Sequence, residues 1–206
     1  MSSLRELQKV SKSALVIIAH PDDESIFMGG TIAEFKKWRW HILCTTDCDE
    51  RYNKTRRAEL LRVCRIYKRH GSKVEPFMLG VVKKKGRFSK AEIAGKIKDY
   101  LRAHRRPDIV FTHNITGEYG HKTHKLIYKA VTEAGLRNIY TFSCGMPAAK
   151  YRSRTEPVKL SRRSFSVKRQ AVRVYIKGSQ RSNLSRLRRV VDNALSSPCE
   201  TFYRHR

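Results

Sequence analysis

Long apolar runs are what this 206-residue sequence lacks most clearly. No apolar stretch reaches the roughly 20 residues that span a bilayer. The N-terminal segment MSSLRELQKVSKS has no apolar core of the kind that secretory signals carry. We therefore expect a soluble protein in the cytoplasm or another intracellular compartment, with no transmembrane segment.

Closely spaced cysteine pairs are also missing. The five cysteines are scattered and form no CxxC pair, which argues against a disulfide scaffold and a Cys-type zinc site. Cys44 and Cys64 have apolar neighbours and are expected to be small core residues. Cys48 has no neighbouring base that would make it a nucleophile, so we expect it to be a bystander.

Acidic residues are outnumbered, 18 against 45 Lys and Arg, and the net charge is +27. Between Lys150 and Arg189 the only acid is Glu156. Such a surface attracts nucleic acid, anionic lipid headgroups or a phosphorylated substrate. The alternative is a solvated surface with no anionic partner. Charge alone does not decide between them.

The most informative stretch is residues 14–24, ALVIIAHPDDE, where an apolar run ends in a histidine and three carboxylates. The run does not alternate with polar residues, which is typical of a parallel strand buried on both faces. Pro21 prevents further regular pairing. His20 and the carboxylates are therefore expected at the carboxyl edge of the strand, where open α/β sheets bind ligands. Capping of the next helix is the alternative for Asp23 and Glu24.

Apolar runs alternate with amphipathic stretches along most of the chain, which favours an α/β fold with a mostly parallel sheet. Residues 143–167 are polar and show no clear period, and nothing marks a second domain, so we expect one domain over residues 1–206. Gly29 and Gly30 are expected where the first helix packs close to a strand. The expected strands are 14–19, 41–46, 74–79, 109–112 and 138–142, and the expected helices are 26–37, 54–69, 89–104, 121–134, 168–175 and 184–195.

A second polar cluster follows the strand expected at residues 109–112. His121 and His124 are three residues apart where a helix begins, so they share one face. With His20 and Asp23 at a neighbouring strand end, two imidazoles and one carboxylate would make a three-ligand metal site with an open position. This ligand type favours Zn²⁺, and Fe²⁺, Co²⁺ or Ni²⁺ suit the same donors.

On these residues the chain resembles the LmbE-like, or PIG-L, family of zinc-dependent N-acetylglucosaminyl deacetylases. The stretch AHPDDE (19–24) is similar to the first motif of that family and GEYGHKTH (117–124) to the second. TRRAELLRVCRIYK (55–68), KRQAVRVYIKGSQ (168–180) and CETFYR (199–204) resemble later motifs and occur in the family's order. The fold implied is a single-domain, Rossmann-like three-layer α/β sandwich.

The resemblance also implies roles for individual residues. His20, Asp23 and His124 would be the zinc ligands, and Asp22 the general base towards a metal-activated water. His121 and Tyr119 would stabilise the oxyanion formed at the substrate carbonyl, and either Asp22 or His121 would protonate the departing amine. Two further residues are implied in substrate binding: Arg56 holds the sugar, and Asp47 lines the site wall, although the loop TTDCDER lacks the family's usual Gly after Asp47.

Two functions from different classes follow. The first is a zinc-dependent hydrolase that removes the acetyl group from an N-acetylglucosamine-type sugar or conjugate, and the intact set of His20, Asp22, Asp23, His121 and His124 favours it. The second is a catalytically silent scaffold that binds nucleic acid or another polyanion through its basic surface. No nucleic-acid-binding motif supports the second, and aromatics are not interleaved with the basic runs.

Overall fold

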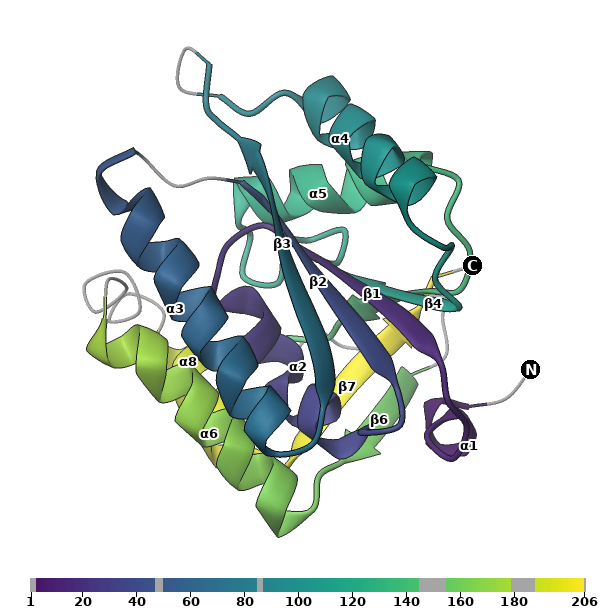
Figure 1. Ribbon diagram of the computed structural model, residues 1–206, viewed down its shortest axis with the longest axis vertical. Coiled ribbons are helices and arrows are strands. Elements are labelled where there is room, and N and C mark those ends of the chain that lie inside the picture. The colour runs from purple at the N-terminus through teal and green to yellow at the C-terminus, as the bar shows by residue number, and fades with distance from the viewer. Residues whose placement is uncertain (1–2, 47–49, 85–86, 145–154, 179–187, 206) are drawn as a thin grey trace.

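The apolar run after residue 12 forms β1 (Ser13–Ile18), which lies in the middle of the sheet in the computed structural model (Figure 1). The structure describes residues 3–46, 50–84, 87–144, 155–178 and 188–205. β1 pairs in parallel with β2 (Arg39–Thr46) on one side and with β4 (Ile109–Thr112) on the other. Both its faces are covered, because Ala14 to Ile18 are buried without alternation.

The full strand order is β3-β2-β1-β4-β5-β7-β6. β3 (Lys73–Val81) and β5 (Ile139–Phe142) extend the parallel part. Two strands that the periodicity did not predict complete the sheet: β6 (Thr155–Lys159) and β7 (Cys199–Arg204), both antiparallel to their neighbours. The prediction of a mostly parallel α/β sheet is confirmed.

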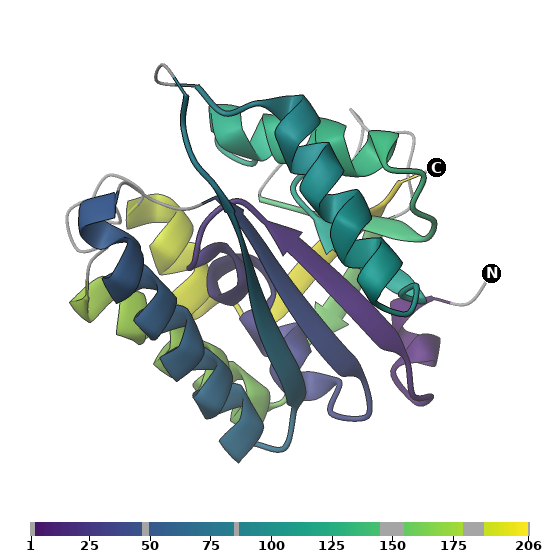
Figure 2. The same cartoon turned by 45° about the horizontal axis from the view of Figure 1, so that its top comes forward.

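Helices cover both faces of the sheet and make three layers (Figure 2). One layer holds α4 (Lys90–Ala103) and α5 (Lys122–Glu133), and the short α1 (Leu4–Leu7) lies near the N-terminus. The other layer holds α2 (Asp23–Glu34), α3 (Glu50–Arg69), α6 (Arg162–Lys177) and α8 (Arg188–Ser196). Each layer has its own apolar core, because alternate residues of β1 point to opposite faces.

Most predicted helices lie within a few residues of the observed ones. The clearest difference is α6, which begins at Arg162 rather than at 168, because its polar first turn is capped by the Ser161 hydroxyl instead of being marked by apolar residues. Ser89 caps α4, because its hydroxyl accepts the Glu92 N–H. None of the described helices combines the length and hydrophobicity that a bilayer-spanning helix needs.

The glycine pair in α2 serves a contact other than the one predicted. A Cβ on Gly29 would lie 2.6 Å from the Tyr67 hydroxyl, and one on Gly30 would lie 2.1 Å from a Leu160 methyl. The glycines therefore let α2 approach α3 and the residue after β6, rather than β1. Cys44 and Cys64 are buried in the core as predicted, whereas Cys48 lies outside the described residues.

Candidate metal and catalytic centre

The site lies where the sheet changes winding direction. Connections from β1 and β4 leave towards opposite edges of the sheet, which opens a crevice at their carboxyl ends. The register pairs Ile17 with Thr112, so the loops that follow the two strands are neighbours. The polar clusters predicted at these two strand ends are therefore brought together.

The loop after β1 presents His20, Asp22 and Asp23. Asp22 has a φ of 138°, a conformation that non-glycine residues rarely adopt. This turn separates the two aspartates: Asp23 opens α2 and accepts the His20 N–H at 2.8 Å, while the Asp22 side chain contacts Arg56. The two adjacent carboxylates are thus held differently by their surroundings, and their division into base and ligand stays a prediction.

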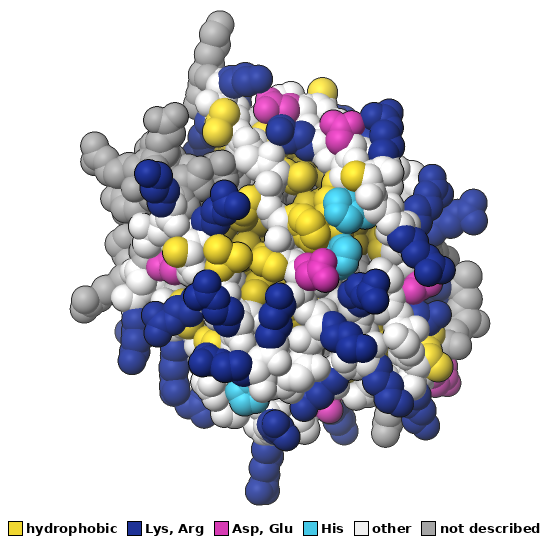
Figure 3. All heavy atoms as spheres, in the orientation of Figure 1, with side chains coloured by type: hydrophobic (Ala, Val, Ile, Leu, Met, Phe, Trp, Pro, Cys, Tyr) yellow, Lys and Arg dark blue, Asp and Glu magenta, His cyan; other side chains and the backbone are white. Residues whose placement is uncertain are grey.

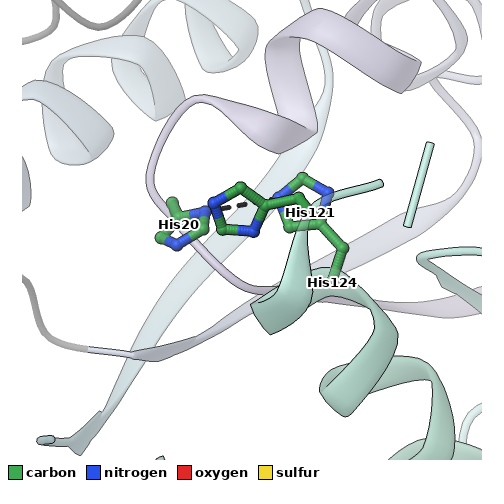
Figure 4. A group of neighbouring side chains, drawn as sticks. All are labelled: His20, His121 and His124. Atoms are coloured by element: carbon green, nitrogen blue, oxygen red, sulfur yellow. Dashed lines mark hydrogen bonds between the residues drawn. The ribbon is translucent and has the colours of Figure 1, made fainter. Parts of the chain in front are cut away.

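The loop after β4 delivers His121 and His124 at the start of α5. Gly117 has a φ of 69°, and a Cβ there would lie 2.5 Å from the His121 carbonyl oxygen, so the turn needs glycine. His121 occupies the position just before α5, and its ring centroid lies 4.4 Å from that of His124. Figure 4 shows both rings directed towards His20.

Donor atoms of three residues converge between the two loops. His124 Nε2 lies 3.4 Å from His20 Nδ1 and 3.4 Å from Asp23 Oδ1, and His20 Nδ1 lies 3.5 Å from Asp23 Oδ2. Ligands about 2.1 Å from a tetrahedral ion are separated by about 3.4 Å. The spacing of these atoms therefore fits a divalent metal.

Neighbouring residues enlarge this donor set. Three overlapping triplets have donor atoms within 4.8 Å of one another, and each contains two of the three predicted ligands. Their remaining members are His121, His113 and Asp22. His113 Nε2 lies 3.4 Å from Asp23 Oδ2 and also accepts the Ala19 N–H at 3.0 Å, a bond that competes with metal for its lone pair.

The ionisation of the site suits a metal. Burial lowers the pKa of His20 to about 4. Burial also lowers the pKa of His121 to about 4, and the nearby His124 and His20 rings add to this effect. Both rings are therefore neutral at pH 7, with a lone pair available. Burial alone raises the pKa of Asp23, but the His124 and His113 rings outweigh it and hold that pKa well below its usual range. Nδ1 of His121 is buried, and no described group hydrogen-bonds to it.

The PIG-L family model, described as GlcNAc-PI de-N-acetylase, matches residues 15–135, a stretch that contains both strand-end clusters. The chain belongs to the PIG-L family. A protein of Acanthamoeba polyphaga mimivirus, named as uncharacterized, is 29% identical over 143 residues, which are 62% of this chain and 60% of that protein. The chain thus matches less than two thirds of the length of this relative.

Solved structures share the fold. N,N'-diacetylchitobiose deacetylase from Pyrococcus horikoshii is 19% identical with a TM-score of 0.65, covering 94% of this chain and 84% of that one. A zinc-inhibited teicoplanin deacetylase is 16% identical with a TM-score of 0.64, covering 93% and 97%. A 4-carboxy-2-hydroxymuconate hydratase from Pseudomonas putida is 16% identical with a TM-score of 0.59, and the match covers 94% of this chain and 95% of that one. Because the fold carries a hydratase as well as deacetylases, it does not by itself specify the reaction.

Sequence reasoning gave no role to two buried residues of this PIG-L site, His113 and Glu118. Glu118 Oε2 accepts from His124 Nδ1 at 2.6 Å and from His113 Nδ1 at 3.0 Å, and Oε1 accepts the Asn114 N–H at 2.8 Å. A carboxylate on the second nitrogen of a ligating histidine fixes the tautomer that leaves Nε2 free for metal. Glu118 lies inside the quoted motif GEYGHKTH, but a lone glutamate gives no sign of which ring it contacts.

Behind Asp22 lies a second buried carboxylate. Glu24 is fully buried and accepts from the Asp22 N–H at 3.1 Å, the Ser25 hydroxyl at 2.7 Å and the Tyr175 hydroxyl at 2.9 Å. Glu24 therefore holds the backbone of the Asp22 turn, and among the described residues it forms no hydrogen bond to the side chain of a predicted metal ligand.

Asp22 is paired with Arg56. The Arg56 guanidinium lies 3.3 Å from Asp22 Oδ2 and donates to the Pro21 carbonyl at 2.8 Å. Burial and the charge of Asp23 raise the pKa of Asp22 well above its usual value, although Arg56 opposes this. Arg56 thus faces the predicted base, and its contact with a sugar stays a prediction.

Tyr119 lies at the rim of the site and is 37% exposed. Burial and the charges of Asp23 and Asp22 raise the pKa of its phenol, so the hydroxyl remains a donor. Its ring centroid is 5.5 Å from that of His124. Asp47, predicted to line the site wall, lies outside the described residues.

Proposed function

We propose that this protein is a metal-dependent N-deacetylase that removes the acetyl group from an N-acetylglucosamine-type sugar or conjugate. The observation that carries the proposal is the convergence of His20 Nδ1, His124 Nε2 and the Asp23 carboxylate at 3.4–3.5 Å, with Asp22 in the same loop. Membership of the PIG-L family supports the amide substrate, and the intact site argues against a catalytically silent scaffold.

His20, Asp23 and His124 would hold the metal, and zinc suits two imidazoles and a carboxylate. When bound there, the ion supplies Lewis acidity towards both the acetamide carbonyl and the attacking water. His121, also close to His20 and His124, is left to contact the substrate. Glu118 keeps His124 in the tautomer that exposes Nε2 to the site.

Asp22 is the proposed proton carrier. Its carboxylate accepts a proton from the attacking water, and the remaining hydroxide forms the new C–O bond at the acetyl carbon. The C–N bond then breaks, and Asp22 returns the proton to the departing amine, so that acetate and a free amino sugar are released. The Arg56 guanidinium and the Glu24 carboxylate hold Asp22 at this position through its side chain and its backbone N–H.

His121 and Tyr119 are the proposed donors to the carbonyl oxygen as negative charge develops on it. A neutral His121 ring and a protonated Tyr119 hydroxyl can both donate a hydrogen bond without losing a proton. Tyr119 is partly exposed at the rim of the site, so a sugar arriving from solvent can reach its hydroxyl.

The test is release of acetate and a primary amine in equal amounts from free N-acetylglucosamine, N,N'-diacetylchitobiose, UDP-N-acetylglucosamine and GlcNAc-phosphatidylinositol. We expect at least one to be hydrolysed by zinc-loaded protein, and activity to disappear with a chelator. An Asp22→Asn variant provides the matched control, because it preserves the predicted ligands. Equal product release by wild type and Asp22→Asn, or none from any compound, would reject the proposal.

A further inference from the structure

From residue 54 onward, the outer face of α3 carries only positive charge among its exposed side chains. Between residues 54 and 69 the one acid is Glu59, and its side chain is buried. The exposed ionisable side chains of this stretch are Lys54, Arg57, Arg62, Arg65, Lys68 and Arg69. Figure 3 shows Lys and Arg side chains over the part of the surface where α3 and α6 lie.

Helix α6 packs beside α3 and repeats the pattern (Figure 1). It contains no acid, and its inward cation, Lys168, is neutralised by Glu200 at 2.9 Å. Its exposed cations are Arg162, Arg163, Arg169, Arg173 and Lys177. No ion pair formed by these five, or by the exposed cations of α3, is found within the described part of the chain.

The helices on the other side of the sheet are different. There, Lys84 pairs with Glu92 at 3.1 Å, Lys90 with Glu133 at 2.8 Å, and Arg102 with Asp99 at 2.9 Å. Within the described residues, several cations on this side of the sheet therefore have carboxylate partners, whereas the exposed cations of α3 and α6 do not. The α3–α6 face gathers cations that form no ion pair within the described residues, and such a face attracts an anionic ligand.

The two helices enclose a groove of about 340 Å³, lined by Arg62, Arg69 and the largely buried Glu59 from α3 and by Arg173 and Lys177 from α6, so four cations outnumber one acid. Arginine forks match the paired oxygens of carboxylate and phosphate groups. Helix α3 also supplies Arg56, which contacts Asp22 in the site. From Arg56 to Arg69 the helix rises by about 20 Å at 1.5 Å per residue, so one helix carries cations from the site to the far end of the groove.

We propose that the α3–α6 groove binds the anionic part of the substrate: a glycoconjugate with its acetylated amino sugar at Asp22 and several acid groups along the groove. The inference rests on the proposed deacetylase function. A flat bilayer fits less well, because the face is concave and Leu61 is the single large apolar side chain exposed on the described parts of α3 and α6. Single-stranded nucleic acid fits less well, because the groove lining contains no aromatic ring for base stacking.

The test compares two oligosaccharides of equal length in zinc-loaded protein. One is neutral, built of N-acetylglucosamine alone, and the other alternates N-acetylglucosamine with glucuronic acid. We expect the ratio of kcat/KM, anionic over neutral, to fall as NaCl rises from about 25 to 300 mM, because the Debye length shortens. We also expect that ratio to fall about tenfold or more in an Arg62→Glu/Arg173→Glu variant, since charge-assisted hydrogen bonds are lost.

A Lys98→Glu/Arg105→Glu variant is the matched control, because it reverses two exposed charges on the opposite layer. We expect its ratio to stay within about twofold of wild type, because these two charges lie on the opposite side of the sheet from the groove and are screened from it by salt. Equal losses of this kcat/KM ratio in both variants would show that only net charge matters and would overturn the groove assignment. A ratio that does not change with NaCl concentration would overturn it as well.

Fluorescence anisotropy with the labelled anionic oligosaccharide separates this inference from the proposed function. If neither oligosaccharide is hydrolysed, binding that is lost only in Arg62→Glu/Arg173→Glu still supports the groove, and absence of binding overturns it. Labelled duplex DNA and vesicles containing phosphatidylinositol are the competing occupants. Tighter binding of either, with the same dependence on Arg62 and Arg173, would overturn the glycoconjugate assignment.

Discussion

Replacing Glu118 by glutamine should weaken metal binding without removing any proposed ligand. The Glu118 carboxylate accepts three hydrogen bonds, from the Nδ1 atoms of His113 and His124 and from the Asn114 N–H. A glutamine has one oxygen. If that oxygen faces the two rings, its NH₂ group opposes the Asn114 N–H, and if it faces Asn114, the NH₂ group opposes both ring donors. At least one buried donor therefore loses its acceptor.

The expected magnitude follows from the role of Glu118 as the partner of a ligating histidine. Loss of such a partner costs about 10- to 100-fold in metal affinity, which corresponds to about 1.4–2.7 kcal/mol. The zinc dissociation constants of wild type and Glu118→Gln are measured by competition with a zinc-chelating dye. Thermal melting of the metal-free proteins separately measures the loss of the charged acceptor, about 1.5–3 kcal/mol for a hydrogen bond to a charged group.

Glu133→Gln is the control, because Glu133 lies on the helix that carries His124, its side chain is largely exposed and it pairs with Lys90. Its zinc affinity should equal that of wild type. A folded Glu118→Gln protein that binds zinc as tightly as wild type would refute the argument, since His124 would then not depend on Glu118 for its tautomer.

Asp22→Asn should retain about one zinc per chain yet lose roughly 10²- to 10⁴-fold in rate, whereas Asp23→Asn should bind zinc more weakly. Identical behaviour of the two variants in metal analysis and kinetics would contradict their separate roles. Glu200→Ala should destabilise by about 3–5 kcal/mol in urea unfolding, because Glu200 pairs with buried Lys168 and accepts the Gly30 and Thr31 N–H groups; a loss below about 1 kcal/mol would contradict this. Burial lowers the pKa of His41, so the unfolded chain binds that proton more readily. Stability should then fall as pH drops through about 6.5, and His41→Gln should show a shallower fall in thermal melts; an unchanged slope would argue against it.

The sequence by itself was enough to locate the centre of the site. A non-alternating apolar run marks a buried parallel strand, and Pro21 marks its end, so His20 and Asp23 had to lie at the carboxyl edge. His121 and His124 share a face because helical periodicity is a local property. The mostly parallel sheet follows for the same reason, since its strands and helices carry distinct hydrophobic periods.

Other features depend on contacts between distant segments, which a local pattern does not encode. β6 and β7 are short and partly polar, and they exist as strands because each pairs with the other and β7 with β5. The site partners of Glu118 and Glu24 depend on loop conformations with positive φ, at Glu118 itself and at Asp22. The contact of Arg56 with Asp22 likewise joins α3 to the β1–α2 loop, and the predicted contact of Arg56 with a sugar stays a prediction. The net charge was visible in the composition, yet only the packing of α6 beside α3 gathers that charge along one groove.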